Sequence, residues 1–305
     1  MKVLLTGGTG FLGGNLVKKL EQHCITVTAP VRKAICSSND FVDYPIFNDI
    51  FEIAQDESMF KGVDVLVHTA AIAHSKSLTE ESYQKINRNL TIALAKAASK
   101  FKLKRFIFIS SIGVNGTSNE VPFKVVDKSN PTESYAVSKY EAEIGLRKIA
   151  EETEMEVVII RPPLVYGKGA PGNFGTLLKV AEKNLPLPLG AINNRRSFVA
   201  IDNLVDFIVT CIDHPNAANQ TFLVSDDEEI STSNLLKKLT LAAGKKPWLI
   251  PVPVSFLKFL ASIIGKKAAV ERFSSSLTVD IEHTKNTLNW KPPITMDEGI
   301  HRCFK

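Results

Sequence analysis

The chain has 305 residues, of which 44% are hydrophobic, so it can bury the core of one large domain or of one domain with a smaller lobe. Its formal net charge is +5, but lysine and arginine are scattered along the sequence, which suits an anionic ligand and does not favour nucleic acid. The four cysteines lie far apart without metal-ligand spacing, so we expect reduced thiols: Cys24, Cys36, Cys211 and Cys303.

Neither end of the sequence nor its apolar stretches indicate a secreted or membrane-spanning protein. The first residues lead directly into an apolar run, so no secretory signal is expected. The most apolar later segment, Val252 to Ile264, is interrupted by Pro253 and Lys258 and is too short to span a bilayer. The sequence therefore predicts a cytoplasmic protein without a membrane span.

The first fourteen residues combine a short strand, Val3 to Leu5, with a glycine-rich turn and the start of an amphipathic helix. Gly7 permits the turn, and Gly10 lets backbone N–H groups approach a pyrophosphate at the helix N-terminus. Gly13 allows the helix to pack closely on the strand. No Gly-Lys-Ser/Thr follows, which excludes a nucleotide-triphosphatase loop. The pattern predicts a dinucleotide-binding element.

Apolar strands alternate with helices as far as residue 161. Strands that are apolar throughout and alternate with helices are typical of a parallel sheet covered on both faces. We therefore predict an α/β fold with a doubly wound parallel (Rossmann) sheet, and a dinucleotide-binding domain over residues 1–161. The later strands are expected at Ile25–Val31, Tyr44–Asn48, Val63–His68, Phe106–Ser110 and Val157–Arg161, and the helices at Phe51–Phe60, Glu80–Lys100 and Ser134–Glu152.

From Pro162 onward prolines become frequent and the expected strands are short. Residues 162–305 are predicted to form mainly a smaller α/β lobe for the substrate, with some strands and helices returning to the first domain. Because ligands of such sheets bind at the carboxyl ends of the strands, we expect the substrate between the lobes. The acidic run Asp226 to Glu229 reads as a solvated turn. Strands are expected at Ser197–Ala200 and Thr221–Val224, and helices at Leu204–Ile212, Ser233–Ala243 and Val254–Ile263.

A tyrosine and a lysine, Tyr135 and Lys139, stand four residues apart on one face of a predicted helix. On its own, this spacing favours a solvated tyrosine–lysine pair over a catalytic one. A free tyrosine ionises near pH 10, and lowering its pKa by about three units requires roughly 4 kcal/mol. A nearby ammonium and an oxidised nicotinamide ring could supply that energy. Ser111, just after the strand that starts at Phe106, would face the same site.

Together, Thr6 to Gly13 with Ser111, Tyr135 and Lys139 resemble the extended short-chain dehydrogenase/reductase family, and the resemblance covers essentially the whole chain. It implies that the serine and tyrosine hydrogen-bond the reacting oxygen, that the tyrosine moves the proton and that the lysine also holds the nicotinamide ribose. The cofactor residues it implies are Gly7, Gly10, Phe11, Leu12, Gly13, the adenine-contacting pair Asp49 and Ile50, Thr69, Ala70, Ala71, Asn87, Tyr135, Lys139 and Pro162.

Within that family the second half is most similar to nucleotide-sugar 4-epimerases and 4-reductases, in segments such as Arg161 to Gly167 and Leu288 to Pro292. The resemblance implies a UDP-sugar substrate and a homodimer. Two arginines suit a diphosphate because their planar forks make paired, charge-assisted hydrogen bonds, although either alone could form a surface salt bridge. The substrate residues it implies are Ser111, Asn173, Arg196 and Arg272, with the backbone from Leu187 to Leu189 reading the uracil edge.

The sequence departs from that pattern in three places. Val31 replaces the aspartate expected for NAD and is followed by the basic pair Arg32 and Lys33, which suits a 2′-phosphate, so NADP becomes plausible beside NAD. Leu164 replaces an asparagine that touches the diphosphate. Ile112 and Gly113 replace the Asp-Glu pair of sugar dehydratases, so elimination lacks a proton relay and we reject it.

Three functions remain open from the sequence. The first is a UDP-hexose or UDP-N-acetylhexosamine 4-epimerase that works through a 4-keto intermediate. The second is an NADPH-dependent 4-keto reductase of a UDP-sugar in surface polysaccharide synthesis. The third is a non-catalytic redox-sensing protein on the same fold. No metal is expected, because His68 and His74 do not match a ligand spacing and read as packing or loop residues.

Overall fold

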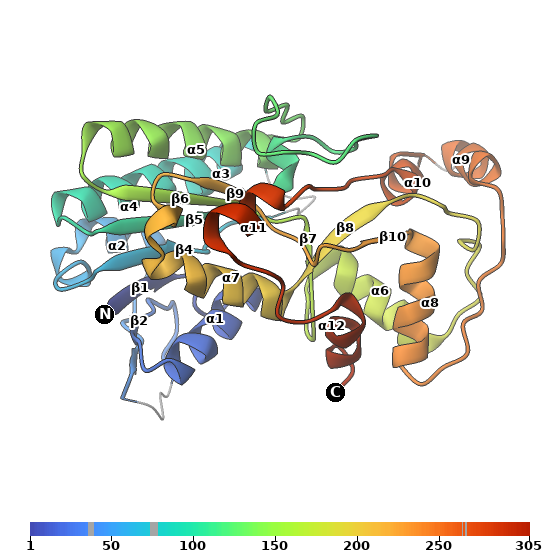
Figure 1. The fold of residues 1–305 in the computed structure, drawn as a ribbon, viewed down its shortest axis with the longest axis horizontal. Coiled ribbons are helices and arrows are strands. Elements are labelled where there is room, and N and C mark those ends of the chain that lie inside the picture. Colours follow the sequence, from blue (N-terminus) through green and yellow to red (C-terminus); the bar gives the residue numbers. More distant parts are fainter. Residues whose placement is uncertain (36–39, 74–78, 264, 266) are drawn as a thin grey trace.

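The computed structural model describes residues 1–35, 40–73, 79–263, 265 and 267–305, so Cys36 and His74 lie outside the described residues. A seven-stranded parallel sheet has the order β3-β2-β1-β4-β5-β6-β9 (Figure 1). The strand order changes direction between β1 and β4, and doubly wound sheets bind their ligands at such a point. The predicted fold class is confirmed. Its strands are β1 (Lys2–Thr6), β2 (Thr26–Thr28), β3 (Val42–Asp43), β4 (Val65–His68), β5 (Arg105–Ile109), β6 (Glu156–Arg161) and β9 (Thr221–Leu223).

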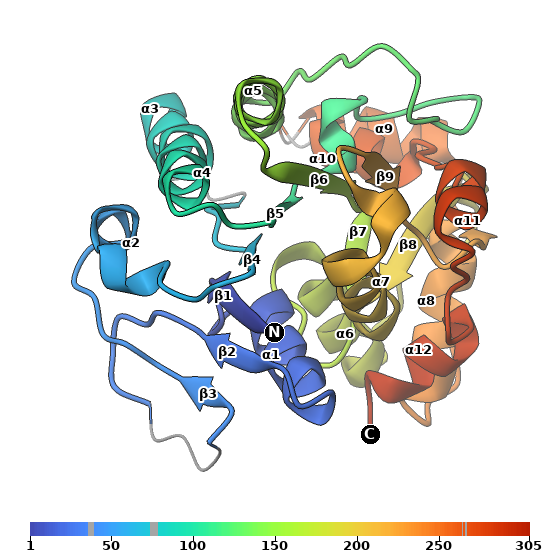
Figure 2. The ribbon, with the colours of Figure 1, turned by 60° about the vertical axis from the view of Figure 1, so that its left-hand side comes forward.

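Helices cover both faces of this sheet (Figure 2). Successive side chains of a strand point to opposite faces, so Leu4 and Leu66 pack into one core with α2, α4 and α5. Leu5 and Val67 pack into the other core with α1 and α7. The helices are α1 (Phe11–Gln22), α2 (Ile50–Gln55), α3 (Glu80–Tyr83), α4 (Leu90–Lys100), α5 (Ser134–Glu152) and α7 (Ile201–Asp213).

Three expected elements differ in detail. The helix expected over Phe51–Phe60 ends at Gln55, because the Asp56 carboxylate caps a separate 3₁₀ turn, Glu57–Met59. The helix expected over Glu80–Lys100 contains a π-helical turn, Gln84–Asn89, between α3 and α4. The strand expected over Tyr44–Asn48 does not form as a regular strand, and the regular strand β3, Val42–Asp43, ends just before it. Beyond β3, Pro45 has no N–H for the ladder, and pairing continues through single bonds to Val31.

The chain after residue 161 forms a three-stranded sheet of order β10-β8-β7 and also returns to the large sheet. Strand β9 adds to β6, and α11 is tied to it because the Thr284 hydroxyl donates to the Leu223 carbonyl at 2.6 Å. The boundary at residues 161 and 162 stays a prediction. The elements are β7 (Leu164–Tyr166), β8 (Arg196–Ala200), β10 (Glu229–Ile230), α6 (Gly172–Lys183), α8 (Thr232–Ala242), α9 (Val254–Ile263), α10 (Lys267–Ser274), α11 (Glu282–Leu288) and α12 (Met296–Arg302).

The expectation of a solvated turn at Asp226 to Glu229 is wrong for its first residue. Asp226 is buried and accepts hydrogen bonds from the Tyr166 hydroxyl at 2.7 Å, the Ala200 N–H at 2.8 Å and the Asn203 amide at 2.7 Å. A buried carboxylate needs such partners to offset its desolvation. Asp226 thereby joins the end of β9 to β7 and to the start of α7.

Candidate functional site

The glycine turn after β1 is built for close backbone approach. Gly7 has a φ of +81°, a conformation that only glycine adopts easily, and its carbonyl accepts the Gly10 N–H at 2.9 Å. A Cβ on Gly13 would lie 2.1 Å from that carbonyl oxygen, so α1 packs on the turn only because residue 13 is glycine. Gly10 is the N-cap residue of α1, whose first N–H groups form an anion-binding end.

The segment after β4 lies directly against this turn. The Thr69 hydroxyl and N–H both donate to the Thr6 carbonyl, at 2.8 and 3.1 Å. A Cβ on Gly7 would meet the Ala70 nitrogen at 2.7 Å. The structure therefore brings Thr69, Ala70 and the glycine turn to one edge of the sheet. Because residues 7 and 13 are glycines, the turn packs closely against this segment and against α1. The N–H groups at the start of α1 complete this glycine cradle, which fits the pyrophosphate of a dinucleotide.

Asn87, which the resemblance implies to be a structural asparagine of the cofactor site, lies beside the segment that follows Ala71. Its side chain is fully buried and clamps the backbone of Ile72, donating to the carbonyl and accepting the N–H, both at 3.0 Å. It also donates to the Ser138 hydroxyl at 3.1 Å, and that hydroxyl donates to the Tyr135 carbonyl at 2.8 Å. Asn87 is a positioning residue that joins the segment after Ala71 to helix α5.

Ser111 and the start of α5 meet at the carboxyl end of β5. The Ser111 hydroxyl accepts the Gly113 N–H at 3.1 Å and caps a short 3₁₀ turn, Ile112–Val114. A Cβ on Gly113 would lie 3.3 Å from the Cβ of Ala136, the neighbour of Tyr135. Pro162 belongs to the same corner, since its carbonyl accepts the Ile112 N–H at 3.0 Å.

Lys139 reaches the same corner from α5. Its ammonium donates to the Ile109 carbonyl at 2.8 Å and lies 4.5 Å from the centre of the Phe108 ring. Burial lowers the pKa of Lys139 to about 7, although the Glu143 carboxylate one turn later raises it. The ammonium and the turn that holds Ser111 therefore meet at the end of β5.

The surroundings of Tyr135 oppose ionisation, contrary to what a neutral-pH base requires. Desolvation, followed by the charge of Tyr83, raises the pKa of the Tyr135 phenol to about 12. The two rings meet edge-on with centroids 6.1 Å apart. The protein by itself thus keeps Tyr135 as a neutral donor. A cation beside the phenol would have to supply the stabilisation of the phenolate.

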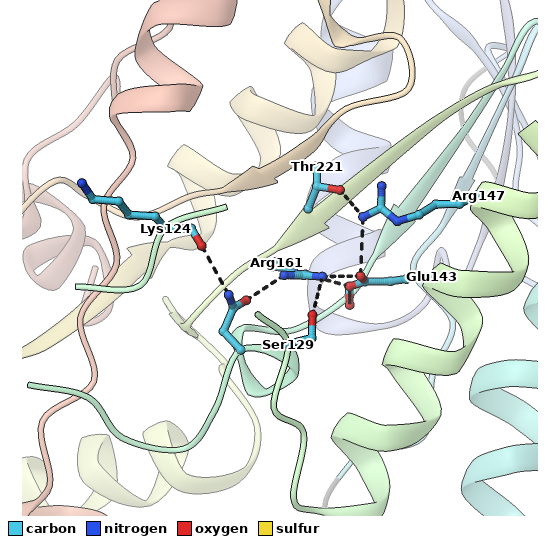
Figure 3. A network of polar contacts seen from close by, with 8 residues as sticks. Lys124, Ser129, Glu143, Arg147, Arg161 and Thr221 are labelled. Carbon is cyan, nitrogen blue, oxygen red and sulfur yellow. Dashed lines mark hydrogen bonds and ion pairs between the residues drawn. The ribbon is translucent and has the colours of Figure 1, made fainter. Parts of the chain in front are cut away.

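A buried polar network supports this corner, and the sequence did not reveal it (Figure 3). Glu143 accepts hydrogen bonds from the Ser110 hydroxyl at 2.5 Å and from Arg161 Nε at 2.9 Å and Nη2 at 2.5 Å. Arg161 also donates to the Asn115 side chain at 2.9 Å. The network ties β5, α5 and β6 together beside Ser111. A single arginine at the end of the apolar run from Val157 was the available signal.

Arg32 and Asp49, which are expected around the adenosine end, are exposed. Arg32 directly follows Val31, whose backbone pairs with Pro45 and Phe47 at the end of the second strand. Asp49 caps α2 by accepting the Phe51 N–H at 3.0 Å through one carboxylate oxygen, which leaves the other oxygen for a ligand. Ile50, Phe11 and Leu12 are half-buried and pack against the two cores.

Two of the expected diphosphate residues come together. Arg196 donates to the Arg272 carbonyl at 2.8 Å, and its pKa is lowered by burial and by the Arg272 charge. Arg272 in turn pairs with Glu133 at 2.8 Å, two residues before Tyr135. Two neighbouring guanidinium groups favour an anion between them. Asn173 is exposed in the first turn of α6, and no contact joins it to these arginines in the described part of the chain.

In the segment expected to read the uracil edge, some backbone groups already form hydrogen bonds within the protein. The Leu187 N–H donates to the Trp248 carbonyl at 3.1 Å, and the Leu187 carbonyl accepts the Ile250 N–H at 2.8 Å. The Leu189 carbonyl accepts the Ser233 hydroxyl at 2.5 Å. The Leu187 N–H is therefore not available to a base, whereas each carbonyl keeps a second lone pair.

His68 is a packing residue, as expected. Its ring is fully buried, with Nδ1 at 2.6 Å from the Thr6 hydroxyl and Nε2 at 3.0 Å from the Thr91 hydroxyl. Burial, followed by the charge of Lys139, lowers its pKa to about 3. Over the described ranges, no group of three or more His, Cys, Asp or Glu side chains could hold a metal ion.

Comparisons with known proteins show the family of this chain. A family model described as the NAD dependent epimerase/dehydratase family matches residues 3–225. A Vibrio cholerae protein described as UDP-glucose 4-epimerase is 46% identical over 98% of this chain and 93% of its own length. An Escherichia coli O157:H7 protein described as N-acetyl-alpha-D-glucosaminyl-diphospho-ditrans,octacis-undecaprenol 4-epimerase is 26% identical over 99% of this chain and 94% of its own.

The fold is also found among solved structures. A crystal structure described as UDP-glucuronic acid 4-epimerase from Bacillus cereus in complex with NAD matches with a TM-score of 0.83 at 20% identity. The match covers 100% of this chain and 95% of that one. With the family model spanning most of the sequence, the chain belongs to the NAD-dependent epimerase/dehydratase family.

Proposed function

We propose that this protein is an NAD-dependent UDP-sugar 4-epimerase. The observation that carries the proposal is the corner at the end of β5, where the turn of Ser111 packs on the residue after Tyr135 and Lys139 bonds the Ile109 carbonyl. This corner and the glycine cradle lie at the same, carboxyl-terminal edge of the parallel sheet. The 46% identity to the Vibrio cholerae protein over nearly the whole chain supports the same activity.

In the proposed mechanism Tyr135 accepts the proton of the sugar 4-hydroxyl, and Ser111 donates a hydrogen bond to the same oxygen. Bound NAD supplies the hydride acceptor and donor. Lys139 contributes positive charge that stabilises the phenolate, which the protein surroundings otherwise disfavour. Arg196 and Arg272 hold the diphosphate while the 4-keto sugar rotates, so that the opposite face of C4 would take back the hydride. Tyr135 returns its proton to the same oxygen, O4, and the configuration at C4 is inverted.

The assay is incubation of the purified protein with UDP-glucose and, separately, UDP-N-acetylglucosamine, without added cofactor. C4-inverted product, detected by chromatography, supports the epimerase. A 4-keto reductase would instead give no inverted product and would consume NADPH with a 4-keto UDP-sugar. If the protein shows neither activity but still binds a dinucleotide fully, that outcome would indicate the redox-sensing alternative.

NADP use is the finer question, and exposed Arg32 is the feature that favours it. A guanidinium at this point suits a 2′-phosphate. We expect Arg32→Ala to weaken NADP binding roughly tenfold and to leave NAD binding nearly unchanged. Equal effects on both dinucleotides, measured by fluorescence titration, would remove Arg32 from this role.

We further propose a homodimer through α4 and α5 in the cytoplasm. Ile144 on α5 is 51% exposed and would be covered by the partner in such a dimer. Gly145 lets α5 approach α4 closely, since a Cβ there would lie 2.2 Å from Ile92 Cδ1. Light scattering of wild type and Ile144→Glu tests this: a dimer that the substitution converts to a monomer supports it, and an unchanged mass contradicts it.

A further inference from the structure

Helix α9 presents an apolar side to solvent. Its exposed residues Phe256 (52%), Phe259 (61%), Leu260 (44%) and Ile263 (68%) follow the spacing i, i+3, i+4, i+7. At about 100° per residue they occupy one stripe about 100° wide. The opposite side faces the protein through Ala261, and α9 lies at the edge of the molecule beside α10 (Figure 1). An outward apolar stripe reverses the usual orientation of a surface helix and indicates a binding surface.

The sequence around α9 is strongly basic. Residues 230–270 contain seven lysines and no aspartate, glutamate or arginine, so this segment carries +7 while the whole chain carries +5. The formal charges of the remaining residues therefore sum to −2. The positive charge is concentrated in this segment and is not scattered evenly along the chain. Lys245 and Lys246, before α9, are exposed, whereas Lys267 after it pairs with Glu271 at 3.7 Å and Lys238 on α8 pairs with Asp297. Such a charge attracts an anionic surface.

An exposed tryptophan precedes α9. Trp248 is 60% exposed, although its backbone is fixed by pairing with Leu187. Ile250, two residues later, is 43% exposed. Tryptophan and phenylalanine on the apolar side and lysine on the polar side are typical of helices that lie in a membrane interface.

From these observations we infer that α9 and the segment before it dock on an anionic phospholipid bilayer, with the α9 stripe in the headgroup boundary. The ten residues of α9 are about 15 Å long, and no helix in the described part of the chain is long and apolar enough to cross a membrane, so the contact is interfacial. A symmetric contact with a second copy would bring the two +7 segments together, which their repulsion disfavours. Because α9 contacts α10, which carries Arg272, docking would set the candidate diphosphate site beside the headgroups.

The experiment is flotation of the full-length protein with vesicles of phosphatidylcholine containing 30% phosphatidylglycerol, in low salt. The chain has only two tryptophans, and Trp290 is 5% exposed, so the fluorescence of Trp248 reports the contact directly. We expect flotation, a blue shift of the emission and reduced acrylamide quenching with anionic vesicles. Pure phosphatidylcholine vesicles, or anionic vesicles in about 0.5 M salt, should bind much less.

Two matched pairs of variants test which surface binds. Phe256→Ser with Phe259→Ser should lower vesicle partitioning roughly 30-fold, whereas Val121→Ser with Val126→Ser, at exposed valines outside the basic segment, should leave it unchanged. Neither pair belongs to the proposed catalytic site, so turnover of a water-soluble UDP-sugar should stay the same in both. The vesicle assay needs no turnover, and its result is independent of the proposed activity.

Absence of flotation with anionic vesicles would overturn the inference, as would equal binding by the phenylalanine and valine pairs. If the phenylalanine pair changed the oligomeric mass while wild type failed to bind vesicles, a second copy would cover the stripe instead. That outcome also contradicts the proposed bilayer contact.

Discussion

The buried pair of Glu143 and Arg161 allows a quantitative test of how the catalytic corner is held. Glu143 is fully buried and Arg161 nearly so, and three hydrogen bonds reach the carboxylate. Glu143→Gln keeps the shape of the side chain but removes its negative charge, so the buried Arg161 guanidinium loses its counter-ion. The new amide NH₂ group would also face hydrogen-bond donors in place of an acceptor. Removing one partner of such a pair costs about 3–5 kcal/mol, a large part of the stability of a typical domain.

Urea unfolding followed by far-ultraviolet circular dichroism measures this cost. Arg161→Met combined with Glu143→Gln should cost clearly less than the sum of the two single changes, because the double variant buries no unpaired charge. Arg147→Met is the control: Arg147 lies 3.9 Å from the same carboxylate but is 46% exposed, and it donates to the Thr221 hydroxyl at 2.6 Å, so its loss should cost about 1–2 kcal/mol, less than the loss of either buried partner. A Glu143→Gln variant within 1 kcal/mol of wild type, or additive single changes, would refute the account.

Three further predictions address the site. Tyr135→Phe should lower kcat about 10²–10⁴-fold with the fold intact, so full activity with UDP-glucose would exclude the proposed proton transfer. Gly13→Ala should abolish tight NAD binding in a titration and cost about 1–3 kcal/mol, because its Cβ would lie 2.1 Å from the Gly7 oxygen; Gly14→Ala, with its nearest contact at 3.5 Å, is the control that should do neither. His68 has a folded pKa of about 3 against 6.5 unfolded, so the unfolded state binds more protons between these values and stability falls as pH drops below 6.5. Wild type should lose about 3 kcal/mol more than His68→Gln between pH 7 and pH 4 in urea unfolding, and equal losses would contradict this.

Much of the fold and part of the site could be predicted from local patterns. The alternation of apolar strands and amphipathic helices gave the parallel sheet, and the helix expected at Val254–Ile263 has those bounds in the structure. Gly7, Thr69, Ser111 and Lys139 could be singled out because each follows a strand or sits on a helix face defined by short-range spacing. Their assembly at one sheet edge follows from the parallel topology.

The sequence by itself determined the strands, the helices and the glycine turn, because these depend on side-chain periodicity and on backbone freedom over a few residues. Only the tertiary structure decided the burial of Asp226, the pairing of Glu143 with Arg161 and the outward direction of the α9 stripe. Each of these depends on which distant segment packs against the residue, and that packing sets whether a charge is solvated or paired and whether an apolar side is covered.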